Sequence, residues 1–450
     1  MTLWSATDAQ AATLGKASAP FGTGGLSIDT RSLKPGDLFV ALKGEARDGH
    51  DFVAAAFAAG AGAALVSRDV PNAGGPLLMV AHTQRGLEDL ARASRARTNA
   101  KVIAVTGSAG KTTTKEILRV AFDALGQTYA SAASHNNHWG VPLSLASAPR
   151  DAVYGVFEVG MNHFGEIRAL VDMVRPHLAL ITTIAPAHLE FFGNCESIAD
   201  AKSEIFEGLE PGGAALIPSD SPYADRLAAR AQKAHVATLT RFGAVAGSDA
   251  RLLSHAHDGD GMRLKADIFG TLVDCKVGAP GGHIAANAVA ALACVHLAGG
   301  DLLNAAASLK NFTALKGRGA RLALKGLTII DESYNANPAS MAAALALLGD
   351  AKGRKIAVLG DMLEMGTGGI AHHAGLAAPI EQNRVDLVFA AGSQMQALWD
   401  ALPASRRGAY AETAAELAPQ VTAALQAGDT ILIKGSNGSR MSLILDALKV

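Results

Sequence analysis

The sequence contains little cysteine, few aromatic residues and almost no net charge. Only 3 of its 450 residues are cysteine, and Phe, Trp and Tyr together make up 5% of the chain. The odd number and wide spacing of Cys195, Cys275 and Cys294 argue against a disulfide framework or a cysteine-ligated zinc site. With 40 basic and 41 acidic residues, the formal net charge is −1, so no basic surface for nucleic acid is indicated.

Long apolar segments are scarce as well. The first residues, MTLWS, have neither the basic nor the apolar region of a signal peptide. The apolar run from Ala54 to Val66 is short and is interrupted by Gly60 and Gly62. We therefore expect a cytoplasmic protein without a membrane span. Because 450 residues exceed the size of one ordinary core, several domains are expected.

The order of strands and helical segments predicts three α/β domains, at 1–100, 101–315 and 316–450. The first contains short apolar runs, such as 38–42 and 63–66, between helical segments. The second contains strands at 153–159 and 178–184 of a largely parallel sheet. The third repeats strand and helix, and one of its helices begins after Thr413, with Glu416 three residues later.

The most informative segment is VIAVTGSAGKTTT at 102–114, where an aliphatic strand leads into a glycine-rich turn and a helix. Glycines let successive backbone N–H groups point at one anion, and the following helix adds its positive end. The lysine and hydroxyl that follow are suited to the phosphates and Mg²⁺ of a nucleoside triphosphate. The residues predicted to bind the phosphates are Gly107, Ser108, Ala109, Gly110, Lys111, Thr112 and Thr113.

The turn departs from the usual G-x-x-x-x-G-K-[ST] pattern, because Val105 stands where the first glycine is expected. Its context supports phosphate binding, since a strand precedes it and Ile117, Ala121 and Leu125 follow at helical spacing. A glycine-rich turn without a ligand is the alternative.

Two polar side chains follow neighbouring strands of the same predicted sheet. Glu158 lies at the end of strand 153–159, and His188 follows strand 178–184. The carboxyl ends of parallel strands meet at one edge of a sheet, so both residues are expected beside the phosphate turn. Glu158 is then a candidate Mg²⁺ ligand, whereas a solvated strand end and an ordinary surface histidine are the alternatives.

Together these residues resemble the Mur ligases, the ATP-dependent amide-forming enzymes of bacterial cell-wall precursor synthesis. The resemblance rests on TGSAGKT at 106–112, on Glu158 and His188, and on AKSE at 201–204. It extends over nearly the whole chain, through SIDTR at 27–31, NNHWGVP at 136–142, VLGDMLEMG at 358–366 and KGSNGSRM at 434–441. The missing first glycine is itself typical of this family.

The resemblance implies a central P-loop-type ATPase domain with a parallel sheet. A small N-terminal α/β domain would bind the UDP end of the substrate, and the C-terminal domain would be Rossmann-like. ATP and two Mg²⁺ ions are the implied cofactors, and UDP-N-acetylmuramoyl-tripeptide and D-alanyl-D-alanine are the implied substrates. ATP would phosphorylate the peptide carboxylate, and the dipeptide amine would attack the acyl phosphate. A cytoplasmic monomer that binds neither nucleic acid nor membrane is expected.

The resemblance also assigns roles to individual residues. The implied catalytic residues are Lys111, Glu158, His188, Lys202 and Arg318. The implied Mg²⁺ ligands are Thr112, Glu158, His188 and Lys202, the last as a carbamate formed with CO₂. The other implied nucleotide contacts are Asn136, Asn137, His283, Asn287, Arg318 and Asp331. The implied contacts to the UDP end are Ser27, Thr30, Arg31, Asp48 and His50.

Alternatives remain open. Lys202 could be a solvated lysine paired with Glu204, and the polar residues near the N-terminus could be ordinary surface charges. For the whole chain, the alternatives are a Mur ligase that adds the third peptide residue, a folylpolyglutamate synthase-like ligase, and a nucleotide switch without ligase activity. A switch is expected to end a strand in a Walker-B aspartate, whereas this sequence presents Glu158.

Overall fold

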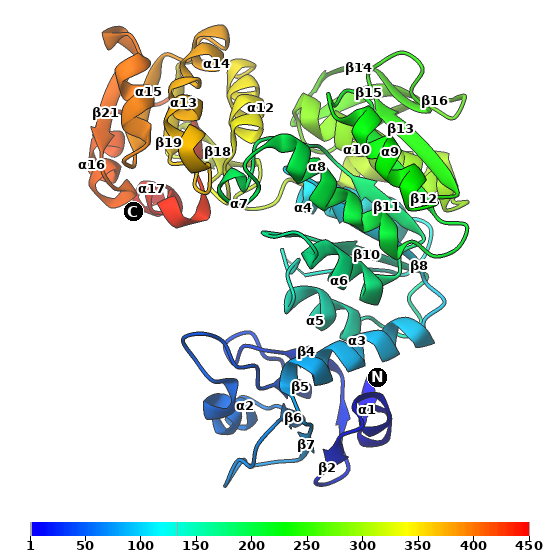
Figure 1. The fold of residues 1–450 in the computed structure, drawn as a ribbon. Coiled ribbons are helices and arrows are strands. Elements are labelled where there is room, and N and C mark those ends of the chain that lie inside the picture. Colours follow the sequence, from blue (N-terminus) through cyan, green and yellow to red (C-terminus); the bar gives the residue numbers. More distant parts are fainter. Residues whose placement is uncertain (1, 133, 450) are drawn as a thin grey trace. The chain divides into compact units, whose positions relative to one another are not determined.

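The computed structural model describes residues 2–132 and 134–449 and has the predicted mixed α/β fold (Figure 1). Its contacts divide the chain into two compact units. The first comprises Met1–Val105, Gly126–Ala179 and Glu204–Ala214, and the second comprises Thr106–Leu125, Leu180–Ser203 and Ala215–Val450. Within the described residues, no helix combines the length and apolarity needed to cross a bilayer.

The N-terminal part of the first unit is a sheet with the order β2-β7-β6-β5-β4. Its strands are β2 (Lys16–Ala17), β4 (Gly25–Ser27), β5 (Asp37–Val40), β6 (Ala63–Val66) and β7 (Leu77–Met79), with β4 to β7 parallel and β2 antiparallel. The helices around it are α1 (Ala6–Thr13), α2 (Val53–Ala58) and α3 (Thr83–Arg97), and β1 (Trp4–Ser5) pairs with β3 (Gly22–Thr23). Leu38 and Val40 pack with α1 and α3, whereas Phe39 packs with α2. Because helices cover both faces of β5, the sequence of this strand is a continuous apolar run.

The same unit contains three parallel strands in the order β8-β10-β9, namely β8 (Lys101–Thr106), β10 (Tyr154–Glu158) and β9 (Thr128–Ala130). The helices α5 (Gly140–Ala146) and α6 (Glu166–Val174) pack with each other and with α3. Glu158 is the register partner of Val105, and the Val159 N–H donates to the Val105 carbonyl at 2.8 Å. The end of β10 is therefore level with the end of β8, where the glycine turn begins.

The second unit begins with that turn and α4 (Lys111–Asp123), which packs against α10 (Gly282–Leu297). Four of its strands adjoin in chain order: β13 (Thr238–Gly243), β14 (Ala250–Asp258), β15 (Gly261–Ile268) and β16 (Thr271–Val277). Its other helices in this region are α7 (Leu189–Phe192), α8 (Cys195–Ser203), α9 (Ala224–Lys233) and α11 (Leu302–Ser308). The strands β11 (Leu178–Ile181) and β12 (Ala214–Pro218) have residues in both units.

The strands β14, β15 and β16 are antiparallel. They are an exception within the largely parallel sheet predicted between 101 and 315, where β8 pairs with β10, β10 with β9, and β13 with β14 in parallel. The buried and exposed residues of β15 alternate, because one face of this strand is solvated.

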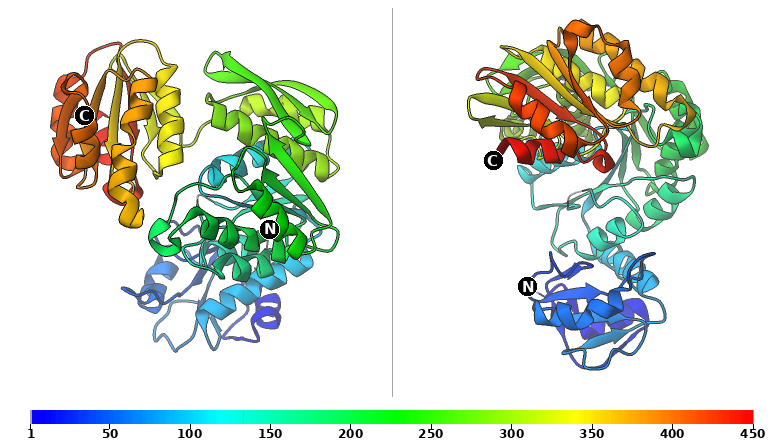
Figure 2. Two further views of the ribbon diagram at one scale, coloured as in Figure 1. Left: turned by 45° about the horizontal axis from the view of Figure 1, so that its top comes forward. Right: turned by 90° about the vertical axis from the view of Figure 1, so that its left-hand side faces the viewer.

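The last part of the second unit is an open sheet with the order β17-β18-β22-β19-β20-β21 (Figures 1 and 2). The strands are β17 (Ala320–Leu324), β18 (Leu327–Glu332), β19 (Lys355–Gly360), β20 (Leu387–Ala391), β21 (Arg407–Ala411) and β22 (Thr430–Lys434); β17 is antiparallel and the others are parallel. One face is covered by α12 (Pro338–Gly349), α13 (Gly369–Ala374), α14 (Ala377–Gln382) and α15 (Met395–Ala401), and the other by α16 (Ala414–Ala424) and α17 (Ser442–Lys449). This doubly wound arrangement confirms the predicted Rossmann-like sheet.

Candidate active site

The predicted phosphate turn connects β8 to α4. Gly107 and Gly110 have φ angles of 151° and 79°, a region that residues with side chains rarely adopt. Gly110 is also the N-cap of α4, so the positive end of that helix begins at the turn. An added Cβ at Gly107 would lie 1.9 Å from Thr182 Oγ1. The turn therefore needs its glycines and has the form of an anion-binding loop.

We expect Gly107→Ala to abolish nucleotide binding, because the new methyl group collides with Thr182 and forces the turn to move. Gly212→Ala is a matched control, since Gly212 also has a positive φ of 79° but an added Cβ there meets no described atom within 4 Å. Titration with a fluorescent ATP analogue should show loss of binding in the first variant only, with thermal unfolding as the check on folding. Parent-like affinity in Gly107→Ala would contradict this account.

Residues after β11 fix the shape of the turn. The hydroxyl of Thr182 donates to the Ala109 carbonyl at 2.6 Å, and the Ala185 N–H donates to Ser108 Oγ at 3.0 Å. The strand predicted over 178–184 ends earlier, at Ile181, and the residues that follow it contact the turn. The loop is thus held in shape by protein groups before any ligand arrives.

Lys111 is the first residue of α4, and its Nζ donates to the Gly107 carbonyl at 2.8 Å. The side chain therefore curves back across the turn, where a lysine can contact phosphate. Thr112 is buried and Thr113 is half-buried in the same helical turn. These positions suit the predicted roles of Lys111 in neutralising charge and of Thr112 in offering a hydroxyl.

Lys202 lies near the end of α8 and is 1% exposed. Burial, and then the positive charge of Lys111, hold the pKa of Lys202 well below its ordinary value. A solvated lysine, the alternative that the sequence left open, is not what the structure shows. The Glu204 carboxylate accepts the N–H groups of Gly165 at 2.8 Å and Arg168 at 3.1 Å, and so caps α6.

His188 precedes α7 and has a left-handed backbone, with φ of 57°. Its Nδ1 lies 2.5 Å from Glu364 Oε2, and this hydrogen bond lowers the pKa of the Glu364 carboxyl. Glu364 lies in the segment 358–366 that resembles the Mur ligases, but no role is predicted for it from the sequence. The two residues are 176 positions apart, so no local pattern indicates that they meet.

In the first unit, Glu158 is 1% exposed at the end of β10 and accepts the side-chain amide of Asn136 at 2.7 Å. The backbone comes close to Asn136 at Gly160, where an added Cβ would lie 2.9 Å from the amide. Asn137 Oδ1 accepts the N–H of Gly140 at 2.9 Å and so supports the start of α5. The structure therefore joins Glu158 to Asn136, whereas the side chain of Asn137 has a local structural contact.

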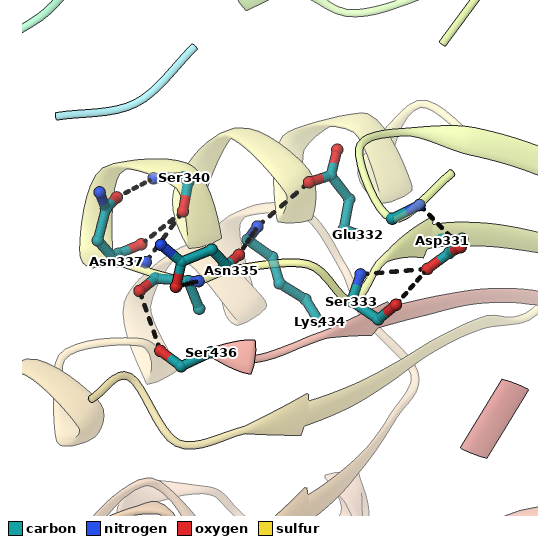
Figure 3. Close-up of polar contacts among 10 residues, drawn as sticks. Asp331, Glu332, Ser333, Asn335, Asn337, Ser340, Lys434 and Ser436 are labelled. Atoms are coloured by element: carbon teal, nitrogen blue, oxygen red, sulfur yellow. Dashed lines mark hydrogen bonds and ion pairs between the residues drawn. The ribbon is translucent and has the colours of Figure 1, made fainter. Parts of the chain in front are cut away.

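Asp331 is 1% exposed near the end of β18 and accepts several hydrogen bonds (Figure 3). The donors are the Gly317 N–H at 2.9 Å and the N–H and hydroxyl of Ser333 at 3.2 and 2.6 Å. Arg318 lies over the ring of Tyr334, 3.9 Å from its centroid. Asp331 thus fixes the backbone that carries Arg318, a role that the sequence did not indicate.

Asn337 is a site residue that sequence reasoning missed. It is 6% exposed, caps α12, and donates from Nδ2 to the carbonyl of Ser108 in the phosphate turn at 3.1 Å. Beside it, Lys434 Nζ donates to Glu332 at 3.2 Å and to the Asn335 carbonyl at 2.9 Å (Figure 3). The Asn-Pro pair signals a helix start, but its contact with a turn 229 residues earlier has no local signature.

His283 and Asn287 lie on α10, as the helical spacing predicts. Asn287 is next to the turn, because an added Cβ at Gly110 would lie 3.2 Å from its Nδ2. Burial lowers the pKa of His283, so its imidazole is neutral at pH 7. The structure therefore brings Asn287 to the phosphate turn and places His283 one helical turn earlier.

The N-terminal part of the first unit contains a cavity of about 590 Å³. Its walls include Thr30 and Arg31, two predicted contacts of the UDP end, together with Arg47, Phe52 and Trp139. Arginines can pair with phosphate oxygens, and aromatic rings can stack on a base. The cavity volume lies in the range of small-molecule sites, and acidic Asp29 and Glu45 line it together with these arginines.

The residues predicted for the UDP end also bond to their own neighbours. The Arg31 guanidinium pairs with Asp29, with Nη2 and Oδ2 2.5 Å apart. The buried imidazole of His50 lies between Asp48, with Nδ1 and Oδ1 2.6 Å apart, and the Ser67 N–H, which donates to Nε2 at 2.9 Å. The Ser27 hydroxyl donates to the Asp29 carbonyl at 2.9 Å. These side chains stabilise the turns that border the cavity.

Family models match three consecutive ranges of the chain: the Mur ligase family catalytic domain at 23–101, the Mur ligase middle domain at 105–295, and the Mur ligase, glutamate ligase domain at 317–437. The chain belongs to the Mur ligase family. The three matches confirm the N-terminal, central and C-terminal parts that the resemblance implied.

Individual Mur ligases match over almost the full length. The UDP-N-acetylmuramoyl-tripeptide–D-alanyl-D-alanine ligase of Escherichia coli (strain K12) is 36% identical over 430 residues, which cover 94% of this chain and 93% of that protein. A MurF crystal structure from Acinetobacter baumannii has a TM-score of 0.87 at 30% identity and covers 99% of this chain and 98% of that one. MurF ligase from Thermotoga maritima in complex with ADP has a TM-score of 0.80 at 26% identity, with 95% and 97% covered.

Proposed function

We propose that this Mur ligase uses ATP to join D-alanyl-D-alanine to UDP-N-acetylmuramoyl-tripeptide. The observation that carries the proposal is a pair of lysines: Lys111 curves over the phosphate turn, and Lys202 is buried within range of its charge. A buried lysine beside Lys111 suits a ligase in which CO₂ modifies that lysine to a carbamate, whereas a nucleotide switch does not require such a residue. Relatives that bear the name of this activity support the choice of substrates.

The reaction that we propose has two steps. The γ-phosphoryl group of ATP passes to the terminal carboxylate of the tripeptide, which releases ADP and forms an acyl phosphate. The amine of D-alanyl-D-alanine then attacks the acyl carbon, so that the amide forms, phosphate leaves and the amine loses a proton. Lys111 and Arg318 would stabilise the charge on the transferred group, and the N–H groups of the turn would orient it.

Further nucleotide contacts belong to the same proposal. We propose that His283 and Asn287 contact the adenine, and the position of Asn287 next to Gly110 supports a contact with the nucleotide. The contact from Asn337 to Ser108 links the last domain to the turn. Asn136, Asn137 and Asp331 remain proposed nucleotide contacts.

The proposed Mg²⁺ ligands are Thr112, Glu158, His188 and Lys202 as a carbamate. Mg²⁺ prefers oxygen donors, and it would supply positive charge to the phosphate oxygens. The buried carboxylate of Glu158 fits this need, as does Lys202, whose uncharged amine is the form that reacts with CO₂. Across residues 2–132 and 134–449, no three His, Cys, Asp or Glu side chains form a metal-binding group. The proposed set is of another kind, because a hydroxyl and a modified lysine belong to it.

For the substrate, we propose that the cavity at Thr30 and Arg31 binds the UDP end. Ser27, Asp48 and His50 would act by holding the surrounding turns. We propose domains at 1–100, 101–315 and 316–450, supported by the three matched ranges. We also propose that the protein is a monomer and acts in the cytoplasm.

Phosphate release from ATP tests the function. We expect release only when UDP-N-acetylmuramoyl-tripeptide and D-alanyl-D-alanine are both present, with the pentapeptide product seen by mass spectrometry. Release with neither acceptor would favour a nucleotide switch. Release with the UDP-linked dipeptide and a single amino acid would favour the Mur ligase that adds the third residue.

A further inference from the structure

Two residues with strained backbones meet at the edge of the proposed metal site. His188 and Glu364 have φ angles of 57° and 62°, which side-chain-bearing residues seldom adopt. Their side chains form the 2.5 Å contact between Nδ1 and Oε2, and the imidazole is only 24% exposed. Such strain persists where the surrounding structure imposes it, and it concentrates at functional sites.

The surrounding contacts show how Glu364 is brought to His188. The Glu190 N–H donates to the Glu364 carbonyl at 3.1 Å, so the backbone reinforces the side-chain contact. Leu189, which lies between His188 and Glu190 in the sequence, packs against the core formed by α12, α14 and α15. The start of α7 therefore contacts the last domain in three ways: through the His188 side chain, through the Glu190 N–H and through the apolar side chain of Leu189.

The segment that carries Glu364 is itself fixed from within the last domain. The Met362 N–H donates to Nε2 of the fully buried His373 at 2.9 Å, and the Leu363 N–H donates to Ser436 Oγ at 2.9 Å. His373 Nδ1 in turn lies 2.7 Å from the Gly369 carbonyl. These bonds fix the backbone immediately before Glu364. The Glu364 carboxylate is therefore preorganised for its contact with His188.

We propose that Glu364 is a positioning residue that orients His188 for metal binding and engages it only when the last domain is docked on α7. A carboxylate that accepts the Nδ1 proton fixes the tautomer in which Nε2 has the free lone pair. It also fixes the plane of the ring. Docking and metal affinity are thereby coupled through one hydrogen bond. This inference rests on the proposed function, because it takes His188 to be a metal ligand.

The test measures binding of Mn²⁺ by electron paramagnetic resonance, in protein saturated with a non-hydrolysable ATP analogue. We expect Glu364→Ala to weaken Mn²⁺ binding by about 10- to 100-fold. Glu364→Gln keeps the shape and a neutral acceptor, so it should recover part of the affinity. Glu381→Gln, which removes an exposed carboxylate from α14 of the same domain, should leave Mn²⁺ binding unchanged. The Mg²⁺ concentration for half-maximal activity should be unchanged in Glu381→Gln, higher in Glu364→Gln and highest in Glu364→Ala.

The outcomes separate this inference from the proposed function. Unchanged Mn²⁺ affinity in Glu364→Ala, together with a loss in His188→Ala, would overturn the role of Glu364 and leave the metal ligand in place. Unchanged affinity in His188→Ala would overturn the ligand itself. Equal losses in Glu364→Ala and Glu364→Gln, accompanied by lower melting temperatures in both, would show a docking contact alone and overturn the positioning role.

Discussion

Lys111→Met is expected to lower the turnover number for amide formation by about 10³-fold, the size of effect seen when one preorganised charge is removed from a transition state. Lys111 begins α4 and already lies across the phosphate turn, with Nζ 2.8 Å from the Gly107 carbonyl. Its charge therefore needs little rearrangement to meet the transferred phosphoryl group. Methionine keeps the length and apolar stem of the side chain but supplies no charge.

Rapid-quench measurement of acyl phosphate formation checks this expectation at the first chemical step. Lys111→Arg should recover only part of the rate, because a planar guanidinium cannot take the position of a compact ammonium group. Lys310→Met removes an exposed lysine and controls for net charge. A Lys111→Met variant with unchanged rate would remove Lys111 from the chemistry, provided that thermal unfolding shows an intact fold.

Much of the fold could be predicted because its signals are local. The helix predicted after Thr413 forms as α16, with Thr413 and Glu416 capping each other as expected. The strand expected at 430–433 is β22, since a strand buried on both faces reads as an apolar run. The antiparallel meander β14 to β16 was not predicted. Alternating polar and apolar residues indicate a half-solvated strand but do not specify which strands pair with it.

The site was less predictable, because its decisive contacts join distant parts of the chain. The phosphate turn and Glu158 were found from strand ends and glycines, which are local features. The contacts of Asn337 with Ser108 and of His188 with Glu364 span 229 and 176 residues and depend on how elements dock. The sequence also named His50 and Asp48 as ligand contacts, whereas their side chains pair with each other. A polar motif alone does not show whether a side chain contacts a ligand or only stabilises a turn.

Removing CO₂ is expected to lower the turnover of the ligase by at least about 10²-fold, because loss of a metal ligand should cost no less than loss of an outer-shell partner. The carbamate forms when an uncharged amine attacks CO₂ and releases a proton. Burial, and then the charge of Lys111, lower the pKa of Lys202, which favours the uncharged amine. The product carries a negative charge, which Lys111 and Mg²⁺ would stabilise. Added bicarbonate should restore activity to the depleted enzyme.

A second buried lysine makes this expectation specific. Lys115 is 0% exposed, its Nζ lies 3.1 Å from Glu116 Oε1, and it is not among the proposed metal ligands. Lys115→Met is therefore a control for the loss of a buried lysine at another place in the chain. With ¹³C-labelled CO₂, the carbamate resonance should therefore disappear in Lys202→Met and persist in Lys115→Met. A carbamate resonance that persists in Lys202→Met would show that another residue is modified. Full activity without CO₂ would show that the ligase does not need a carbamate on Lys202.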